Sequence, residues 1–288
     1  MESFRFKFNF INGILLFIVT LVTMPKLNKS LKLTFVFLLI LITGLSSVLY
    51  GCGLSQVSKT NKLKAALFYK LGIGYYQNGN YVKAMQEFIR AKTLNPYSAK
   101  NFNAIGMVYM MTHRRGKAIV NFKRAVGLNQ KFSYAYYNLA LIYIKERNYK
   151  IAKIDLKSAL LNHFYNQPYE SYTQLARIYI KENKLKKAEK LLLISESLGK
   201  KYFLTYYYFG EFYLIKGKLG RSLSNFKKAL SINSSFIPAE YKEGVVYFKL
   251  KKYGKAKIIF TSLYRQNGSN EIGLKSLNYL KKIKLPGH

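Results

Sequence analysis

The sequence has few of the residues that build disulfides, zinc sites and other metal centres. It holds one cysteine, no tryptophan and three histidines in 288 residues. A single cysteine cannot close an intramolecular disulfide, and no cluster of cysteine and histidine has the spacing of a zinc site. We therefore expect no metal and no cofactor. Cys52 is a free thiol, one half of an intermolecular bridge or a modified residue.

Acidic residues are also scarce. Asp and Glu number 12, with Asp155 as the single aspartate, against 48 Lys and Arg, which gives a net charge of +36. This imbalance favours an anionic neighbourhood such as nucleic acid, phospholipid headgroups or an acidic glycan. The A/T-rich codons of Lys, Asn, Ile, Tyr and Phe offer a second explanation. Glutamate has such codons too and is scarce here, so codon usage does not explain the whole imbalance.

Two apolar runs open the chain. The first, at 8–23, is shorter than the roughly 20 apolar residues that a membrane span needs. The second, at 33–51, follows three lysines and ends in small residues before Cys52. Counted from Met24, this is the order of a signal peptide. We therefore predict a start at Met24 rather than Met1, a mis-called extension or extra apolar segment at 1–23, and a lipoprotein signal peptide at 24–51.

The residues Leu49-Tyr50-Gly51-Cys52 resemble a bacterial lipobox, although Tyr50 is bulkier than the residue usual at its position. The resemblance implies diacylation of the Cys52 thiol, cleavage before it and acylation of the new amino group, and several acyl chains make a stable anchor. Gly53, in place of a retention aspartate, implies the outer membrane. The alternatives are an uncleaved signal anchor with an incidental cysteine, or two apolar runs that both span the inner membrane.

After a tether, which with Cys52 covers 52–64, the chain repeats itself. Tyrosines recur at spacings of 34, 34, 36, 34 and 34 residues: Tyr75, Tyr109, Tyr143, Tyr179, Tyr213 and Tyr247. A small residue and a large apolar residue follow at the same spacings, namely Ala84, Ala118, Ala152, Ala188, Ser222 and Ala256, then Phe88, Phe122, Leu156, Leu192, Phe226 and Phe260. Three series in one register are typical of tetratricopeptide units, each a helix–turn–helix.

The apolar pattern within each unit predicts two helices that pack closely against each other. Gly72, or an alanine in other units, leaves room for the second helix, whose matching stripe includes Ala84 and Phe88. No unit can bury its apolar face alone. We therefore predict an all-α fold, a right-handed superhelical solenoid of six tetratricopeptide (TPR) repeats at 65–270, closed by a cap helix within 271–288.

A second stripe on the first helices predicts a groove for an extended or helical apolar peptide. The stripe breaks in the fourth unit, where Arg177 suits a carboxylate or a peptide end. The predicted groove residues are Tyr69, Ile73, Tyr76, Met107, Met110, Tyr134, Tyr137, Leu141, Arg177, Tyr207, Leu214, Tyr241 and Val245. The alternative is that these side chains only pack between adjacent units.

Enzymatic and nucleic-acid functions find less support. His113, His163 and His288 have no partner acid at matching spacing, so no catalytic residue is expected. The lysines cluster in turns and on second helices without a nucleic-acid motif, and a secretory signal would remove the chain from cytoplasmic nucleic acid. A solvated outer face near anionic lipid or glycan is another interpretation of the charge.

The spacing of 36 between the third and fourth units falls in ALLNHFYNQPYESYTQLA, 159–176. Together with the lipobox and six units, this junction resembles the type IV pilus biogenesis and stability lipoproteins, the outer-membrane pilotins of pilus secretins. Tyr165 and Pro168 match the family at the junction. Asn166 and Gln174 depart from it, since proline and asparagine are common there, and this chain is far more basic.

The resemblance implies a non-enzymatic protein that binds secretin subunits and promotes their assembly into an outer-membrane ring. We therefore interpret the chain as a monomeric, lipid-anchored TPR assembly factor at the outer membrane, facing the periplasm. The alternative is a general envelope scaffold that binds peptides or protein complexes and is anchored in the inner or outer membrane.

Overall fold

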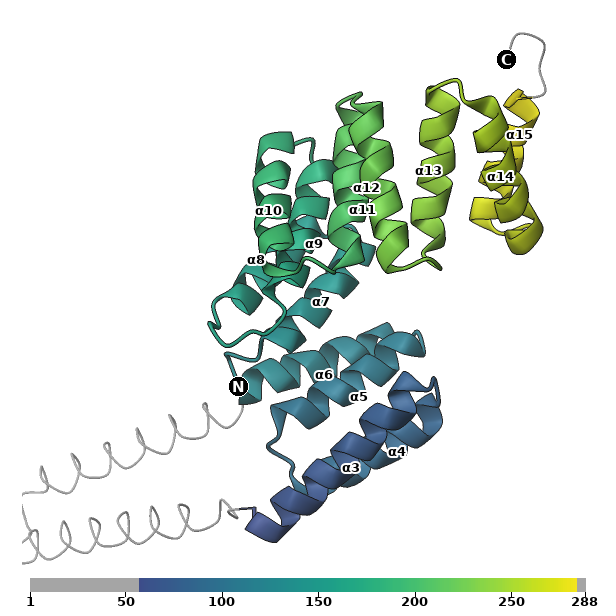
Figure 1. Ribbon diagram of the computed structural model, residues 1–288. Helices are drawn as coiled ribbons and strands as arrows, with labels where there is room; N and C mark the ends of the chain where they lie inside the picture. Colours follow the sequence, from purple (N-terminus) through teal and green to yellow (C-terminus); the bar gives the residue numbers. More distant parts are fainter. Residues whose placement is uncertain (1–56, 284–288) are drawn as a thin grey trace, which may run out of the picture. The chain divides into compact units, whose positions relative to one another are not determined.

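The computed structural model of the chain describes residues 57–283 (Figure 1). The predicted signal peptide, Cys52 and the rest of 52–56 lie outside the described residues, whereas the remainder of the predicted tether is described and is helical from Lys59 onward. Within residues 57–283, helices alternate with short turns and no strand occurs. The predicted all-α array of six helical hairpins and a C-terminal helix is confirmed.

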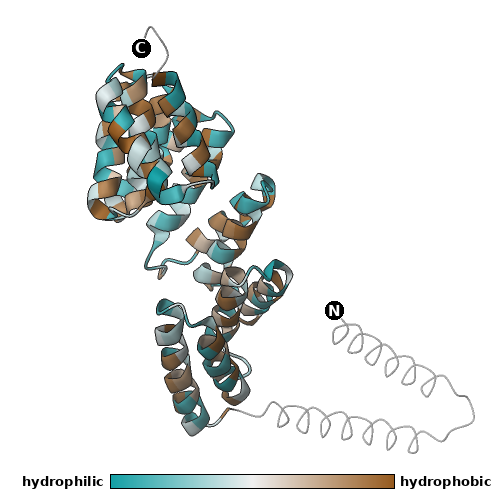
Figure 2. Ribbon diagram, turned by 90° about the vertical axis from the view of Figure 1, so that its right-hand side faces the viewer, coloured by the Kyte–Doolittle hydropathy of each residue, from teal (hydrophilic) through white to brown (hydrophobic). Residues whose placement is uncertain are grey.

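Each hairpin consists of a first and a second helix. The six pairs and the last helix are α3 (Lys59–Gln77) and α4 (Tyr81–Leu94), α5 (Ala99–Met111) and α6 (Arg115–Leu128), α7 (Ser133–Lys145) and α8 (Tyr149–Leu160), α9 (Pro168–Lys181) and α10 (Leu185–Leu198), α11 (Phe203–Ile215) and α12 (Leu219–Ile232), α13 (Ile237–Lys249) and α14 (Tyr253–Asn267), and α15 (Glu271–Ile283). Hydrophobic residues recur along every helix, and hydrophilic residues gather at the turns (Figure 2).

The two helices of every hairpin are joined through a residue in the left-handed backbone region. The backbone N–H of the next residue then closes the turn, as where Arg114 N donates to Tyr109 O at 2.8 Å. For a residue with a side chain, this backbone conformation costs about 1 kcal/mol of conformational free energy. Glycine nevertheless occurs in only two of the six turns: Gly79, His113, Arg147, Asn183, Gly217 and Lys251. Packing of the paired helices therefore outweighs the local preference.

The paired helices approach most closely at a small residue of the first helix. A Cβ built on Gly210 would lie 2.5 Å from Cε1 of the buried Phe226. Three other hairpins repeat this contact: Gly72 with Phe88, Gly106 with Phe122, and Gly244 with Phe260. The missing side chain of the glycine thus makes room for the ring.

The third and fourth hairpins use a different pair at the same contact. Ala140 and Ala176 occupy the glycine position, and Leu156 and Leu192 occupy the phenylalanine position; all four are fully buried. Alanine with the smaller leucine occupies roughly the space of glycine with phenylalanine, as close packing requires. The sizes of the two residues are therefore matched within each hairpin.

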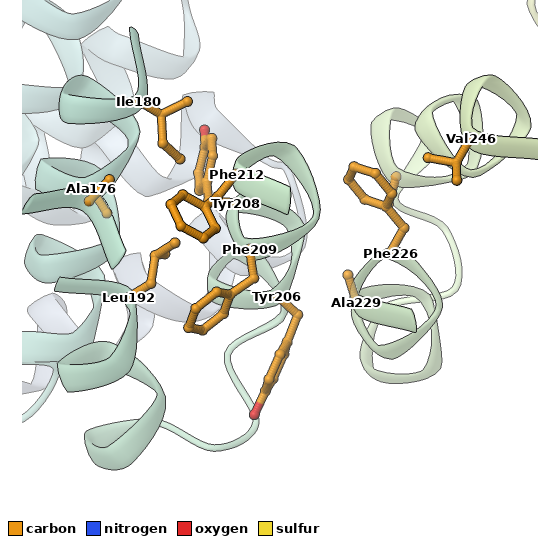
Figure 3. Close-up of a cluster of buried hydrophobic side chains, with 12 residues drawn as sticks. Ala176, Ile180, Leu192, Tyr206, Tyr208, Phe209, Phe212, Phe226, Ala229 and Val246 are labelled. Atoms are coloured by element: carbon orange, nitrogen blue, oxygen red, sulfur yellow. The ribbon is translucent and has the colours of Figure 1, made fainter. Parts of the chain in front are cut away.

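Neighbouring hairpins stack through their first helices. α5 contacts α7 and α9 contacts α11, while each second helix packs against the next first helix, as α10 does against α11. Figure 3 shows part of this core, with Phe209 and Phe212 of α11 between Leu192 of α10 and Phe226 of α12. We call the side of the first helices that points away from the second helices the inner face.

α15 covers the last hairpin. The ring of Tyr279 stacks on Phe260, with 4.7 Å between centroids and planes 11° apart. Ile272, Leu280 and Ile283 pack against the same cluster. This end of the array therefore has its apolar face covered.

The longer connection between α8 and α9 folds back onto the array. Tyr165 is only 5% exposed, and its ring meets that of Tyr134 edge-on at 5.4 Å. The side-chain amide of Asn162 donates to Lys131 O at 2.9 Å. Pro168 lies in the first turn of α9, where its missing N–H costs nothing. Tyr165 and Pro168 thus fix how the fourth hairpin begins.

We expect Gly210→Ala to lower the free energy of unfolding by about 1–3 kcal/mol, because the new Cβ meets Phe226. Adding Phe226→Leu copies the pair of the third and fourth hairpins and should recover at least half of that loss. Urea denaturation followed by circular dichroism measures both. Gly220→Ala on α12, where a Cβ has open space, is the control and should be neutral or stabilising by up to about 1 kcal/mol. No recovery in the double variant would contradict size matching.

Candidate protein-binding site

The residues of the predicted groove all lie on first helices. Twelve of them are half-buried, and Val245 is only 7% exposed. The structure therefore gives these side chains neighbours within the protein before any partner binds.

In the first two hairpins these neighbours belong to clusters that a hairpin shares with the next one. The Tyr69 ring lies 5.8 Å from that of Phe88, and Ile73 and Tyr76 pack against the same cluster. Met107 and Met110 pack against the cluster that contains Phe122. Packing within a hairpin, as of Tyr69 on Phe88, and packing between adjacent units, the alternative considered from the sequence, together account for these contacts. Whether the side chains also meet a ligand stays a prediction.

The last two hairpins show the same pattern. Tyr207 meets Phe236 edge-on at 5.2 Å, and Leu214 packs against the same core. Tyr241 lies 5.9 Å from Phe260, and Val245 belongs to that cluster. Both ends of the predicted groove therefore take part in the core.

Between these ends a row of polar side chains crosses four first helices. We call this row the polar seam; it consists of Tyr137 on α7, Gln174 and Arg177 on α9, Tyr208 and Glu211 on α11, and Lys242 on α13.

Direct contacts connect the seam from α7 to α11. The Tyr137 hydroxyl interacts with the side chain of Gln174. Arg177 Nη1 donates to Gln174 Oε1 at 3.3 Å, and its guanidinium lies 5.9 Å from the centroid of the Tyr208 ring. None of the ion pairs among residues 57–283 involves Arg177. The half-buried guanidinium therefore keeps N–H donors for a ligand carboxylate or carbonyl.

An ion pair continues the seam to α13. Lys242 Nζ lies 2.6 Å from Glu211 Oε1, and these side chains are 29% and 13% exposed. Burial raises the pKa of Tyr208 to about 12, against the opposing effect of Arg177. The tyrosine is thus a neutral hydroxyl at physiological pH. The seam thus combines both signs of charge with several hydrogen-bonding groups, of which Gln174 and Tyr208 are buried at 3% and 9% exposed.

Glu170 lies beside the α7 end of the seam. It stands in the first turn of α9 and has no ion-pair partner among residues 57–283. Burial raises its pKa to about 7. Its charge adds to burial in raising the pKa of Tyr137 and of Tyr134. Glu170 is therefore a titratable group at neutral pH, surrounded by tyrosines.

A buried hydroxyl cluster supports the fourth hairpin and explains why Thr173 interrupts the apolar stripe. The hydroxyls of Thr173, Ser195 and Thr205 lie 2.7 to 2.9 Å from one another. Ser195 also donates to Tyr169 O at 2.9 Å. These bonds tie α9 to α10 and α11 and hold the helix that carries Gln174 and Arg177.

Sequence reasoning named Tyr137 and Arg177 but missed the rest of the seam. The sequence did contain a signal for the seam. One position of the repeat, directly after the stripe residue, carries a polar side chain in four successive units: Asn138, Gln174, Tyr208 and Lys242. A buried bond from Asn138 Nδ2 to Asn103 Oδ1 at 2.9 Å extends the polar row to the second hairpin. Comparing this position across units would have found the seam.

The described residues offer chemistry for recognition. Residues 57–283 contain no group of three or more His, Cys, Asp or Glu placed for a metal ion. Over the same range, none of the helices combines the length and the apolar character that a membrane span requires. The seam supplies a guanidinium, an amide, hydroxyls and an ion pair, which are groups that orient a polypeptide ligand.

Comparisons with known proteins agree with this fold. A tetratricopeptide-repeat family model matches residues 133–161 and 169–193, in the third and fourth hairpins. No curated protein matches the sequence. Among solved structures, PilF of Pseudomonas aeruginosa is similar with a TM-score of 0.65 and 14% identity, over 76% of this chain and 99% of that one.

Two further structures are similar. PilW, described as a widely conserved type IV pilus biogenesis factor, has a TM-score of 0.64 and 16% identity over 74% of this chain and 98% of that one. The Cut9–Hcn1 hetero-tetramer of the APC/C has a TM-score of 0.70 and 16% identity over 77% of this chain and 43% of that one. At these identities the likeness concerns the fold alone.

We expect Glu170→Gln to weaken the pH dependence of stability. The folded pKa of about 7 lies above the ordinary value of 4.5, so the folded state holds the proton more tightly. The stabilisation that protonated Glu170 gives the folded state is fully present below about pH 4.5 and is lost as the pH rises through 7. The loss in unfolding free energy between about pH 5 and about pH 8 should be smaller in Glu170→Gln by about 1–3 kcal/mol.

Urea denaturation at both pH values measures this difference. Glu189→Gln on α10, the same substitution outside the seam, is the control and should keep the dependence of the wild type. Identical pH dependence in all three proteins would contradict the burial of an unpaired carboxyl at position 170.

Proposed function

We propose that this tetratricopeptide-repeat protein is a lipid-anchored periplasmic assembly factor, which binds outer-membrane secretin subunits and promotes their multimerisation in type IV pilus biogenesis. It would act as a monomer and without catalysis, by holding a polypeptide segment of the subunit.

The observation that carries protein binding is the polar seam. It is continuous across α7, α9, α11 and α13, and aromatic and apolar side chains flank it on the same helices. A bound segment would place a carboxylate or carbonyl on Arg177 and form a hydrogen bond with Tyr137, while the buried Gln174 contacts and positions both side chains. Such a combination of aromatic anchors and arginine is typical of protein interfaces.

The distribution of charge favours protein over nucleic acid at this face. The seam pairs Glu211 with Lys242, and Glu170 lies beside it, so its acids nearly balance its bases. A nucleic-acid groove is instead lined by one sign of charge, because phosphates dominate the affinity. The inner face thus suits a polypeptide despite the net charge of +36.

Two observations support a role in pilus biogenesis. The lengthened junction, with Tyr165 buried and Pro168 starting α9, carries the resemblance to the pilus lipoproteins. PilW, whose fold this chain resembles along nearly all of PilW's length, is described as a pilus biogenesis factor. Both point to the same process, and neither names the partner.

The membrane anchor belongs to the proposal as well. Acylation of Cys52 would hold the array at the outer membrane, facing the periplasm, where secretin subunits arrive before they form a ring. Several acyl chains on one residue give the lasting attachment that a single chain does not.

A second candidate is a general envelope scaffold for other protein complexes. The Cut9–Hcn1 likeness favours it, since a similar helical array is part of an unrelated assembly. The identity of the captured subunit separates the two candidates.

We expect cells that lack this protein to lose heat- and detergent-resistant secretin multimers while monomers persist, which a blot measures. Arg177→Glu, which reverses the charge at the centre of the seam, should lower the multimers strongly. A hot-spot loss of about 2 kcal/mol corresponds to roughly 30-fold weaker binding. Lys190→Glu, the same charge reversal on α10, is the matched control and should leave multimers unchanged.

Unchanged multimers in cells without the protein would contradict the secretin role. Multimers lost on deletion but normal with Arg177→Glu would leave that role in place and contradict the seam as its site. Cys52→Ser tests the tether in the same blot, because an unanchored array should assemble fewer multimers.

A further inference from the structure

The outer side of α3 carries three exposed leucines. Leu63, Leu67 and Leu71 are 64%, 58% and 46% exposed. At four-residue spacing they form one stripe within about 80° of the helix circumference. The stripe lies opposite Ala65 and Gly72, which are buried toward the rest of the array.

The register positions of Leu67 and Leu71 are covered in the later hairpins, whereas Tyr97, the counterpart of Leu63 in the second hairpin, is 51% exposed. The counterparts of Leu71 in α5, α7, α9 and α11 are Ile105, Leu139, Leu175 and Phe209, each 3 to 4% exposed. There the second helix of the preceding hairpin packs over them, as α4 does over α5. α3 is the first helix of the array (Figure 1), and no described residue covers its leucines.

This open face is strongly basic at its edges. Lys59 and Lys70 border the leucines on one side and Lys64 on the other, and α3 contains no acidic residue. The single acid of the first hairpin, Glu87, is 11% exposed and paired with Arg90 at 3.0 Å. An apolar stripe flanked by lysines is complementary to a surface with an apolar interior and negative headgroups.

Other occupants fit less well. A second copy would bring its own α3 lysines against these lysines, and like charges repel. A nucleic acid would match the lysines, but its recognition uses exposed aromatic side chains for stacking and gains nothing from three exposed leucines. The leucines and lysines together therefore favour a lipid bilayer.

The position of α3 in the chain supports the same partner. α3 begins at Lys59, seven residues after Cys52 and eight after the apolar run ends at 51. Seven extended residues reach about 25 Å at most. An attachment at Cys52, or through the apolar run itself, would keep α3 within that distance of the headgroups.

We propose that the leucine stripe of α3 lies in the headgroup region of an anionic bilayer, with Lys59, Lys64 and Lys70 at the phosphates. Contact through α3 would cover the open end of the solenoid and fix how the array stands on the membrane. The inference rests on the membrane attachment in the proposed function and not on the secretin partner.

The absence of tryptophan from the chain provides a clean reporter. Leu67→Trp places a single tryptophan in the stripe, and Ile258→Trp, at a 72% exposed position of α14, is the matched control. The full chain is reconstituted in vesicles of phosphatidylcholine and phosphatidylglycerol that carry nitroxide lipids. We expect a blue shift and at least twofold quenching for Leu67→Trp, and neither for Ile258→Trp. With phosphatidylcholine alone the quenching should fall by half or more.

Any other result contradicts a specific part of the proposal. A chain that floats with the vesicles while Leu67→Trp reports water contradicts the inference and leaves the attachment in place. A chain that does not float contradicts both. A blue shift without lipid quenching means that protein, such as a second copy, covers the stripe. Equal quenching at both positions contradicts docking through α3, and quenching unaffected by phosphatidylglycerol contradicts the role of the lysines.

Discussion

The structure depends on the close approach of two helices at one small residue in every hairpin. Where that residue is glycine, a phenylalanine ring lies against its backbone, and where it is alanine, a leucine takes the ring's place. This contact fixes the distance between the paired helices. It also sets which side of each first helix is buried against its partner and which side is left as the inner face. The positive-φ turns and the stacking of hairpins follow from keeping this contact in all six units.

The polar seam is a consequence of that repetition. Because each hairpin has the same geometry, one register position of each first helix comes to lie beside the same position in the next. Gln174, Tyr208 and Lys242 occupy this position at 34-residue spacing. Arg177 contacts Gln174 and Tyr208, and Glu211 pairs with Lys242. A solenoid thus converts a sequence repeat into a row of neighbouring positions, and a substitution in one unit changes only that unit's part of the row. The fourth hairpin supplies Arg177 of the seam and Glu170 beside it.

The fold was predictable because its determinants are local and repeated: tyrosine, alanine and phenylalanine each recur in one register. The site was predictable only in part. Periodicity identified the first-helix stripe, but it could not tell that Tyr69 and Tyr241 pack against Phe88 and Phe260 of their own hairpins. Such contacts depend on how the packed helices are displaced relative to one another. For the same reason the burial of Glu170 and its effect on the tyrosines of α7 could not be read from spacing.

The central claim is that the inner face around the seam holds a polypeptide of the secretin. A photoreactive amino acid at position 141 tests it most directly, since Leu141 is half-buried on α7 one turn from Tyr137. After irradiation of living cells, a blot should show the secretin subunit cross-linked through position 141. The same photoreactive residue at position 190, on the exposed side of α10, should capture none. Secretin captured equally at both positions, or through position 190 alone, would contradict the account.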